Sequence, residues 1–251
     1  MNFPQRRTFS GATIKCQDDK VYPMYSWLNH FQLYLFDFDG LLVNTEETHY
    51  LAYKRMCERR GFAFPFSFEA YCKAAHYESE AFKHRIYEAI PELVAQEPSW
   101  DVLYAEKKQA VGELLDEGTA TLMPGVESFL TALDKTNAKK AVVTNSPDTL
   151  VNILRKQHPI LSTIPHWITR HHYTHAKPHP ESYLAAISKL HKEGERIIGF
   201  EDTPRGIRAL LETPALPIMI SATFYPEIPT FQTQGILHYP SFQKIQAADI
   251  Q

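Results

Sequence analysis

The chain of 251 residues has 44% hydrophobic and 22% charged residues, a composition typical of a globular protein large enough for one α/β core and an inserted subdomain. Its formal net charge of −3 gives no electrostatic reason to expect nucleic acid as a partner, because proteins that bind nucleic acid usually carry a basic excess. Three cysteines without CxxC spacing, and no apolar run near the ~20 residues that span a bilayer, favour a cytoplasmic protein without a zinc site, a disulfide framework or a membrane partner.

Residues 1–30 precede the first strand that we predict. They mix β-favouring residues such as Thr13, Ile14, Val21 and Tyr22 with polar residues, which favours an extra edge strand or a hairpin over a second domain. We therefore expect residues 1–30 to form an N-terminal extension packed on the core.

The first strand is predicted at Leu33–Phe36, a short continuous apolar run that suits a strand buried on both faces of a parallel sheet. Asp37 and Asp39 follow it, and Gly40 lets the chain turn where a side chain would obstruct. Ligands of such sheets bind at the carboxyl ends of the strands, so we expect both acids to face one crevice. Two close carboxylates need a counter-cation, and Mg²⁺ prefers oxygen ligands of this kind. For an isolated Asp-x-Asp, an acidic turn that caps the next helix is the more common explanation.

The next block of sequence is predicted to be helical. A helix should begin at Asn44–Thr45, with Glu47 three residues after the cap, and should end before Gly61. Apolar residues then recur every three to four positions from Glu69 to about Gly118, without a strand-like run. A crossover between parallel strands needs far fewer residues. We therefore predict a helical cap over residues 49–118, inserted into an α/β core of residues 31–48 and 119–251.

A helix over Glu127–Asp134 is expected to lead to the second strand, Ala141–Val143, which Thr144, Asn145 and Ser146 follow. A hydroxyl and an amide at the end of a strand can donate hydrogen bonds to a phosphoryl oxygen without adding negative charge beside the acids. An equally good interpretation is a turn in which Ser146 is the N-cap of the next helix.

A third strand is predicted around Trp167–Thr169, followed by a loop rich in histidine that contains Lys177, Pro178 and Pro180. The prolines hold this loop in a defined path. The histidines are His171, His172, His175 and His179. We do not expect them to bind a metal, because no cysteine or acid accompanies them at the spacing of a ligand set.

A fourth strand is predicted at Ile197–Phe200, with Glu201 and Asp202 at its end. Thr203 and Pro204 begin the helix that follows, where proline is tolerated because its missing N–H is not needed. Further strands are expected at Ile218–Ile220 and Ile236–His238.

Four segments of this chain resemble, in order, the four motifs of the haloacid dehalogenase superfamily of phosphohydrolases. The first, Asp37–Glu46, has the form found in the β-phosphoglucomutase-like branch with a helical cap. The others are Thr144 with Asn145, the Lys177–Tyr183 segment and the Gly199–Leu210 segment. The resemblance covers about residues 33–220 and implies a Rossmann-like three-layer core, in which helices flank a parallel sheet, with the helical cap inserted.

The resemblance also implies a function, the Mg²⁺-dependent hydrolysis of a small phosphorylated metabolite through an aspartyl-phosphate. Asp37 would attack phosphorus, and Asp39 would protonate the leaving oxygen and then accept a proton from water. Thr144 and Lys177 would hold and neutralise the transferred phosphoryl group. The implied metal ligands are Asp37, Asp39, Glu201 and Asp202, and we expect Gly40, Asn145, His76 and Tyr77 to contact the substrate. We expect a monomer or a weak dimer.

Three alternatives to a phosphatase remain. In a phosphomutase a second hydroxyl of the substrate replaces water, but the mutases of this branch carry a Gly-x-Ser-Arg type segment in the cap where this chain has Ala74–Ser79. A dehalogenase would lack the acid that Asp39 supplies. A binding protein without catalysis would not need all the catalytic positions that this chain retains. A phosphatase is therefore the favoured hypothesis.

Overall fold

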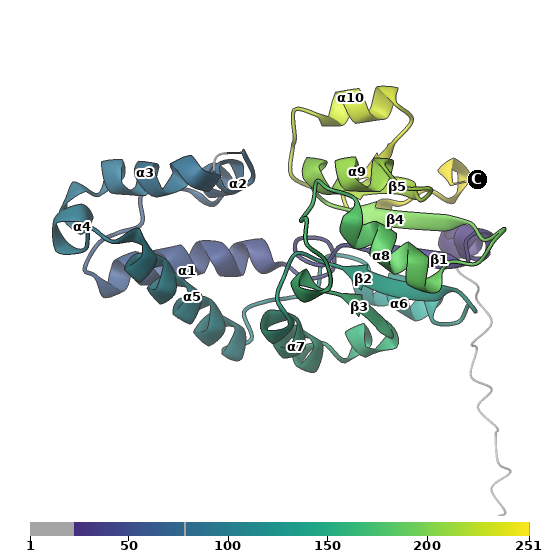
Figure 1. Ribbon diagram of the computed structural model, residues 1–251, viewed down its shortest axis with the longest axis horizontal. Coiled ribbons are helices and arrows are strands. Elements are labelled where there is room, and N and C mark those ends of the chain that lie inside the picture. Colours follow the sequence, from purple (N-terminus) through teal and green to yellow (C-terminus); the bar gives the residue numbers. More distant parts are fainter. Residues whose placement is uncertain (1–22, 78, 251) are drawn as a thin grey trace, which may run out of the picture.

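The computed structural model describes residues 23–77 and 79–250, and its centre is a six-stranded sheet (Figure 1). The strand order is β3-β2-β1-β4-β5-β6, and every neighbouring pair is parallel. The strands are β1 (Leu33–Phe36), β2 (Lys139–Val143), β3 (His166–Ile168), β4 (Ile197–Glu201), β5 (Leu216–Ile220) and β6 (Leu237–Tyr239). The predicted α/β class with a parallel sheet is confirmed, and each strand lies within two residues of its predicted position.

The central position of β1 explains its continuous apolar sequence. It pairs with β2 on one side and with β4 on the other, and its four side chains are fully buried. Alternate side chains of a strand point to opposite faces of the sheet. Tyr34 and Phe36 accordingly join one hydrophobic cluster, and Leu33 and Leu35 join another.

Helices cover both faces of the sheet and complete the three layers (Figure 1). α6 (Val126–Leu133) and α7 (Asp148–Gln157) contribute to the cluster around Tyr34 and Phe36. α8 (Glu181–Leu190) and α9 (Pro204–Leu211) contribute to the cluster around Leu33 and Leu35. The remaining short elements of this part are α10 (Ile228–Thr233) and the 3₁₀-helices η2 (Pro159–Thr163), η3 (Arg170–His172), η4 (Phe242–Lys244) and η5 (Ala247–Asp249).

Five helices form a second lobe beside the sheet, which we call the helical lobe (Figure 1). They are α1 (Thr45–Arg59), α2 (Phe68–Tyr77), α3 (Ser79–Ala89), α4 (Pro91–Gln96) and α5 (Trp100–Asp116). The helical lobe has its own cluster of buried residues, which includes Met56, Phe82 and Leu103. Two chain segments connect the helical lobe to the sheet. They lie side by side, since Val43 in the first forms an antiparallel bridge with Leu122 in the second.

The start of α1 follows the predicted capping arrangement. Asn44 is the N-cap, its side chain accepts a hydrogen bond from the Glu47 N–H, and its Nδ2 donates to Glu47 Oε2 at 3.0 Å. This cap directs the chain from the acidic turn of residues 37–40 into the helical lobe. No helix among residues 23–77 and 79–250 has both the length and the apolar character needed to cross a membrane.

The N-terminal extension is described only from residue 23, so the prediction for residues 1–22 lies outside the described residues. Pro23–His30 forms a 3₁₀-helix, η1, and not the strand or hairpin expected for this extension. Trp27 of this segment is 1% exposed, and its ring lies 5.9 Å from that of Phe129 and 6.4 Å from that of Phe200. A short segment can be held in this way because one large aromatic side chain buries much apolar area.

We predict that Trp27→Ala lowers the free energy of unfolding by about 3–5 kcal/mol, the usual loss for truncating a fully buried tryptophan. Urea unfolding followed by circular dichroism measures it. Asn29→Ala, in the same segment but exposed, is the matched control and should change the free energy by less than about 0.5 kcal/mol. Equal, small losses for both variants would mean that η1 does not stabilise the core.

Candidate active site

The candidate site lies where the carboxyl ends of β1, β2 and β4 meet. Phe36 is in register with Phe200 of β4, so Asp37 and Glu201 follow next to each other at the same edge of the sheet. Val142 of β2 is in register with Phe36 on the other side, which brings Thr144 close to the same edge. The parallel sheet therefore brings Thr144 and Glu201 close to Asp37, from which each is more than 100 positions away in the chain.

Lys177 is the centre of the hydrogen bonds in this site. Its Nζ lies 2.6 Å from Asp37 Oδ1 and 2.7 Å from Glu201 Oε1, and it also donates to the Val143 carbonyl at 2.7 Å. The Tyr183 hydroxyl lies 3.1 Å from the same Nζ and donates to Glu201 Oε1 at 2.5 Å. Lys177 therefore joins the ends of three neighbouring strands.

The charges of this site perturb one another strongly because they are buried. Burial alone would lower the pKa of Lys177, but the carboxylates of Asp37 and Glu201 raise it above its ordinary value, so the ammonium group stays charged. Burial raises the pKa of Glu201 to about 7, and the charge of Asp37 adds to this rise. Burial, with the charges of Asp37 and Glu201, also raises the pKa of Asp202 well above its ordinary value. The single positive charge of Lys177 thus does not balance the negative charges that Asp37, Glu201 and Asp202 can carry.

Three of these acids form a group that can hold a cation. One carboxylate oxygen each from Asp37, Glu201 and Asp202 lies within 4.8 Å of the others. Glu201 Oε2 and Asp202 Oδ1 are buried and have no hydrogen-bond partner among the described residues. Buried, unpartnered carboxylate oxygens are costly, and a divalent cation with a preference for oxygen would satisfy them. The donor set therefore fits a metal such as Mg²⁺.

Two glycines keep space free around the acids. A side chain at Gly40, which has φ +78°, would overlap the Asp202 carboxylate, and one at Gly206 would overlap the Glu201 carboxylate. The Gly40 N–H donates to the Val43 carbonyl at 2.8 Å. The structure therefore supports a spacing role for Gly40, whereas its predicted contact with substrate stays a prediction.

Asp39 is oriented separately from the three acids of the cation group. Its Oδ2 accepts hydrogen bonds from the Thr144 hydroxyl at 3.0 Å and from the Ser146 hydroxyl at 2.6 Å, while its Oδ1 is buried without a partner among the described residues. The carboxylate of Asp39 is not part of the group of Asp37, Glu201 and Asp202. The two aspartates of the Asp-x-Asp pair thus have different surroundings.

Ser146 is a site residue that the sequence did not single out. The alternative that made it the N-cap of the next helix is wrong, because α7 begins at Asp148 and Pro147 occupies the N-cap position. The signal that could have identified Ser146 is a third polar residue directly after the buried strand β2.

Asn145 is held by Tyr173, whose hydroxyl donates to Asn145 Oδ1 at 2.6 Å and lies 2.8 Å from the Thr144 carbonyl. With its oxygen engaged, the Asn145 amide is left to donate through Nδ2. Asn145 borders a small hollow of about 40 Å³ beside Lys177. The other residues that line this hollow are Asp37, Asp39, Glu46, Glu201, Asp202, Thr203 and Arg205.

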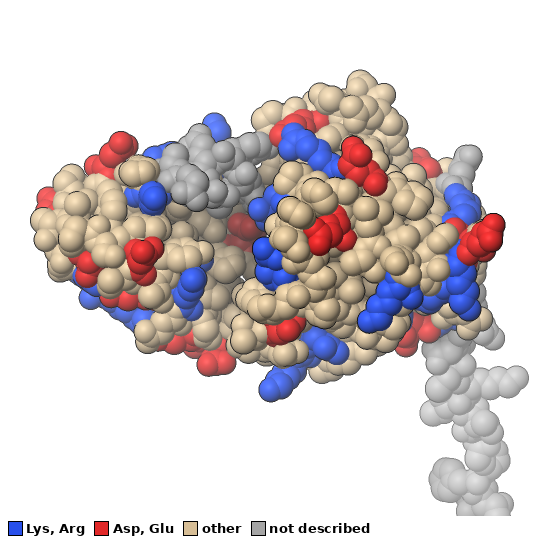
Figure 2. Space-filling view, viewed as in Figure 1, with Lys and Arg blue, Asp and Glu red and all other residues tan. Residues whose placement is uncertain are grey.

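The hollow lies in the region between the two lobes of the molecule. Figure 2 shows the surface hollowed between the helical lobe and the sheet, with acidic and basic side chains inside the hollow. The small hollow of about 40 Å³ is lined by five carboxyl groups but only two basic side chains, Lys177 and Arg205. A phosphate dianion would be repelled from such a surface unless a cation accompanied it.

The helical lobe contributes a buried group of ionisable residues that the sequence also did not single out. Burial, with the charge of Asp39, raises the pKa of Glu46 to about 7. Burial lowers the pKa of Lys107 to about 8, and the Lys107 ammonium lies 3.0 Å from Nδ1 of His49. Lys107 is nearly inaccessible and lies over the ring of Tyr53, 4.9 Å from its centroid. Glu46 connects this group to the small hollow that it helps to line.

The side chains of His76 and Tyr77, near the end of α2, lie outside the described part of the structure, so their contact with substrate stays a prediction. His175 and His179 approach Glu181, but they are exposed, and Glu181 accepts hydrogen bonds from the N–H groups of Thr174 and His175 at 2.8 Å each. Glu181 therefore holds the loop that carries Lys177.

Comparisons with known proteins identify relatives for most of the chain. Residues 31–212 match the family model described as haloacid dehalogenase-like hydrolase. A protein of Thermotoga maritima named phosphorylated carbohydrates phosphatase is 26% identical over 182 residues, which cover 70% of this chain and 78% of that protein. A protein of Drosophila melanogaster named probable pseudouridine-5′-phosphatase is 29% identical over 183 residues, which cover 70% of this chain and 75% of that protein.

The fold is also similar to solved structures. The crystal structure of a β-phosphoglucomutase from Clostridium difficile superimposes with a TM-score of 0.62 at 21% sequence identity, covering 88% of this chain and 95% of that chain. At this identity the similarity shows a shared fold. The resemblance predicted from the four motifs is thus confirmed for the family and its fold.

We predict that Gly40→Ala weakens the binding of a divalent cation at least about tenfold, as changes that displace a metal ligand commonly do. The affinity for Mn²⁺, measured from the electron paramagnetic resonance signal of the free ion, tests this. Gly61→Ala is the matched control, because Gly61 has φ +86° and open space where a side chain would lie. Both variants should lose roughly 1–2 kcal/mol of stability from the left-handed backbone. Equal Mn²⁺ affinities would mean that Gly40 makes no room for Asp202.

Proposed function

Because the chain belongs to the haloacid dehalogenase-like hydrolase family, we propose that it hydrolyses phosphate monoesters of small metabolites with Mg²⁺ and through an aspartyl-phosphate on Asp37. The observation that carries this proposal is the buried contact of Lys177 with Asp37 and Glu201, beside acids whose oxygens lack partners. The two curated relatives described above are both named as phosphatases, which supports an enzyme of this class.

Asp37 is the nucleophile in this proposal. Lys177 donates a hydrogen bond to Asp37 Oδ1 at 2.6 Å and thereby orients this carboxylate at the carboxyl end of β1. An Asp37 oxygen forms a bond to phosphorus while the bond from phosphorus to the leaving oxygen breaks. The same lysine offsets negative charge on the phosphoryl group, and it is suited to this task because the carboxylates of Asp37 and Glu201 keep it protonated.

Asp39 moves the protons in both half-reactions. Two hydroxyl groups, from Thr144 and Ser146, fix its Oδ2, which leaves the buried Oδ1 to exchange a proton. In the first step Asp39 gives its proton to the leaving oxygen, so that an alcohol departs. In the second step it accepts a proton from water, whose oxygen bonds to phosphorus as the bond to Asp37 breaks and inorganic phosphate is released.

Asp37, Glu201 and Asp202 would hold the metal ion. When bound, the ion supplies positive charge that offsets the charge of the transferred phosphoryl group. Glu201 has a second task, because its Oε1 accepts hydrogen bonds from both Lys177 and Tyr183. Its other oxygen is the one available to the cation.

A phosphomutase is the alternative that uses the same residues, with a substrate hydroxyl in place of water. A panel of phosphate esters that includes hexose 1-phosphates, assayed for both phosphate release and transfer within the sugar, distinguishes the two activities. Net release of phosphate supports the phosphatase, whereas formation of hexose 6-phosphate without release supports the mutase. Neither activity on any ester would indicate a binding protein on this fold.

We predict that EDTA abolishes phosphate release and that added Mg²⁺ restores it. Asp202→Asn removes one of the three acids and should raise the Mg²⁺ concentration needed for half-maximal rate at least about tenfold. A titration of the rate with Mg²⁺ measures this, and Asp249→Asn, far from the site in η5, is the control. Full activity in excess chelator would contradict the proposed metal dependence.

We predict different defects for the two aspartates of the pair. Asp37→Asn should form no phosphoenzyme with any substrate, because an amide replaces the nucleophile. Asp39→Asn should slow turnover by ~10²–10⁴-fold, the usual contribution of general acid–base catalysis. With an ester whose leaving group is acidic, Asp39→Asn should still phosphorylate Asp37 and then accumulate the intermediate.

Mass spectrometry of the peptide that contains Asp37 detects the added phosphoryl group. Normal turnover by Asp37→Asn, or a phosphoryl group on a histidine, would show that the nucleophile is assigned to the wrong residue.

A further inference from the structure

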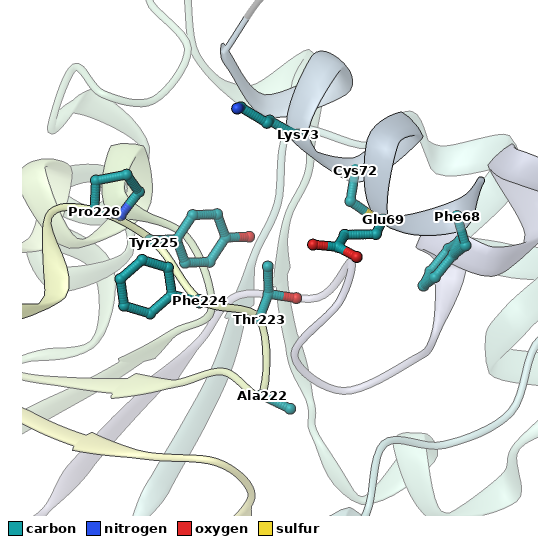
Figure 3. A pocket seen from close by; sticks show the side chains of 9 residues that line it. All are labelled: Phe68, Glu69, Cys72, Lys73, Ala222, Thr223, Phe224, Tyr225 and Pro226. Atoms are coloured by element: carbon teal, nitrogen blue, oxygen red, sulfur yellow. The ribbon is translucent and has the colours of Figure 1, made fainter. Parts of the chain in front are cut away.

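A large cleft separates the first half of α2 from the loop between β5 and α10 (Figure 3). Its volume is about 620 Å³, which is within the range of ligand sites in proteins. The wall from the helical lobe carries Phe68, Glu69, Cys72 and Lys73, and the opposite wall is residues 222–226. The two lobes of the molecule thus each supply one side of the cleft.

Both walls of the cleft begin next to the candidate active site. Residue 222 follows β5, which pairs with β4 in parallel, so this wall leaves the sheet at the same edge as Glu201 and Asp202. The other wall is α2, in which the ring of Tyr71 lies 5.7 Å from that of Tyr50 in α1, the helix whose first turn carries Glu46 of the small hollow. That hollow of about 40 Å³ has room for only about three atoms of the size of water. The part of a substrate beyond its phosphoryl group must therefore lie outside it.

The cleft exposes aromatic rings on both sides. Phe224 is 77% exposed, the largest value for a large hydrophobic side chain among the described residues, and Phe68 on the opposite wall is 42% exposed. A single exposed aromatic side chain is common on a protein surface, but two that line one cleft offer apolar area that a bound ligand can cover. Flat apolar rings of this kind bind planar groups by stacking.

Charged groups stand beside the aromatic rings on the helical-lobe wall. Figure 3 shows the Glu69 carboxylate directed into the cleft, with the Lys73 ammonium one helical turn further along α2. The carboxylate accepts hydrogen bonds and the ammonium donates them. A sugar phosphate would cover less of this aromatic area than a flat ring does, and an aliphatic chain would leave both charged groups without hydrogen-bond partners. A planar ring that carries N–H groups and carbonyl oxygens suits both features.

We propose that this cleft binds the leaving group of the substrate and that the leaving group carries a planar heterocycle with hydrogen-bond donors and acceptors, as in a nucleoside monophosphate. The proposal rests on the proposed phosphatase function. The phosphoryl group would occupy the small hollow at the sheet edge, the pentose would bridge the two spaces, and the heterocycle would stack on Phe224 with its polar edge toward Glu69 and Lys73.

Uridine 5′-monophosphate, adenosine 5′-monophosphate and ribose 5-phosphate form the matched substrate set, because the third has the same phosphate and pentose but no base. We expect kcat/KM for at least one nucleotide to exceed that for ribose 5-phosphate by about tenfold or more, a ratio that base–aromatic stacking can supply. Phe224→Ala should lower the nucleotide value about tenfold and change the ribose 5-phosphate value less than about twofold. Leu184→Ala, a truncation of another exposed apolar side chain on α8 that does not line the cleft, is the control.

Two results would overturn the proposal. One is equal kcat/KM for the nucleotides and ribose 5-phosphate in the unaltered protein. The other is a loss in Phe224→Ala that is the same for all three substrates, since this would mean that Phe224 supports the active site and not the base. Glu69→Gln adds a second probe, because it should change the preference between uridine and adenosine nucleotides, whose polar edges differ.

Binding of the nucleosides uridine and adenosine, measured by calorimetry, separates this proposal from the phosphatase function. Nucleoside binding that Phe224→Ala abolishes, without hydrolysis of any ester, would support the cleft and contradict the function. Hydrolysis of ribose 5-phosphate, without nucleoside binding or nucleotide preference, would support the function and contradict the cleft.

Discussion

The burial of Lys177 between Asp37 and Glu201 is the interaction on which the site depends. A buried ammonium is tolerated because two carboxylates and the Val143 carbonyl surround it at 2.6–2.7 Å. These partners belong to β1, β2 and β4, so the lysine also ties together the strand ends that carry the chemistry. The remaining acids exceed what one lysine can balance, and a bound cation would offset this excess.

In the proposed function, the edge of the sheet carries out the chemistry and the cleft between the two lobes selects the leaving group. Asp37, Glu201 and Asp202 sit at the ends of buried strands, where packing holds them in place, and Lys177 reaches them from the loop before α8. The cleft above them has one wall from the helical lobe and one from a surface loop, and these carry exposed residues such as Phe224 and Lys73. Changes in these walls can alter the leaving group that fits without disturbing the sheet edge.

Local patterns were sufficient to predict most of the fold. Continuous apolar runs such as Leu33–Phe36 identify buried parallel strands, and the Asn44–Glu47 cap identifies the start of α1, because both depend only on neighbouring residues. The alternative that made Ser146 a helix N-cap was wrong, because a serine hydroxyl can equally cap a helix or donate a hydrogen bond to a distant aspartate. The prediction was also wrong for Pro23–His30, whose 3₁₀-helix is stabilised by Trp27 packing on Phe129, a contact that β-propensity does not express.

The sequence by itself determined the strands, the order of the four motifs and the residue types available for phosphate chemistry, since these follow from periodicity and local spacing. Only the tertiary structure decided that Asp39 turns to Thr144 and Ser146 while Asp37 turns to Lys177, and that Glu46 and Arg205 reach the same hollow. It also decided that Phe68 and Phe224 face one cleft. The physical reason is that each of these contacts joins side chains that are far apart in the chain. The parallel pairing of the strands and the placement of the helical lobe beside the sheet set the distances between them.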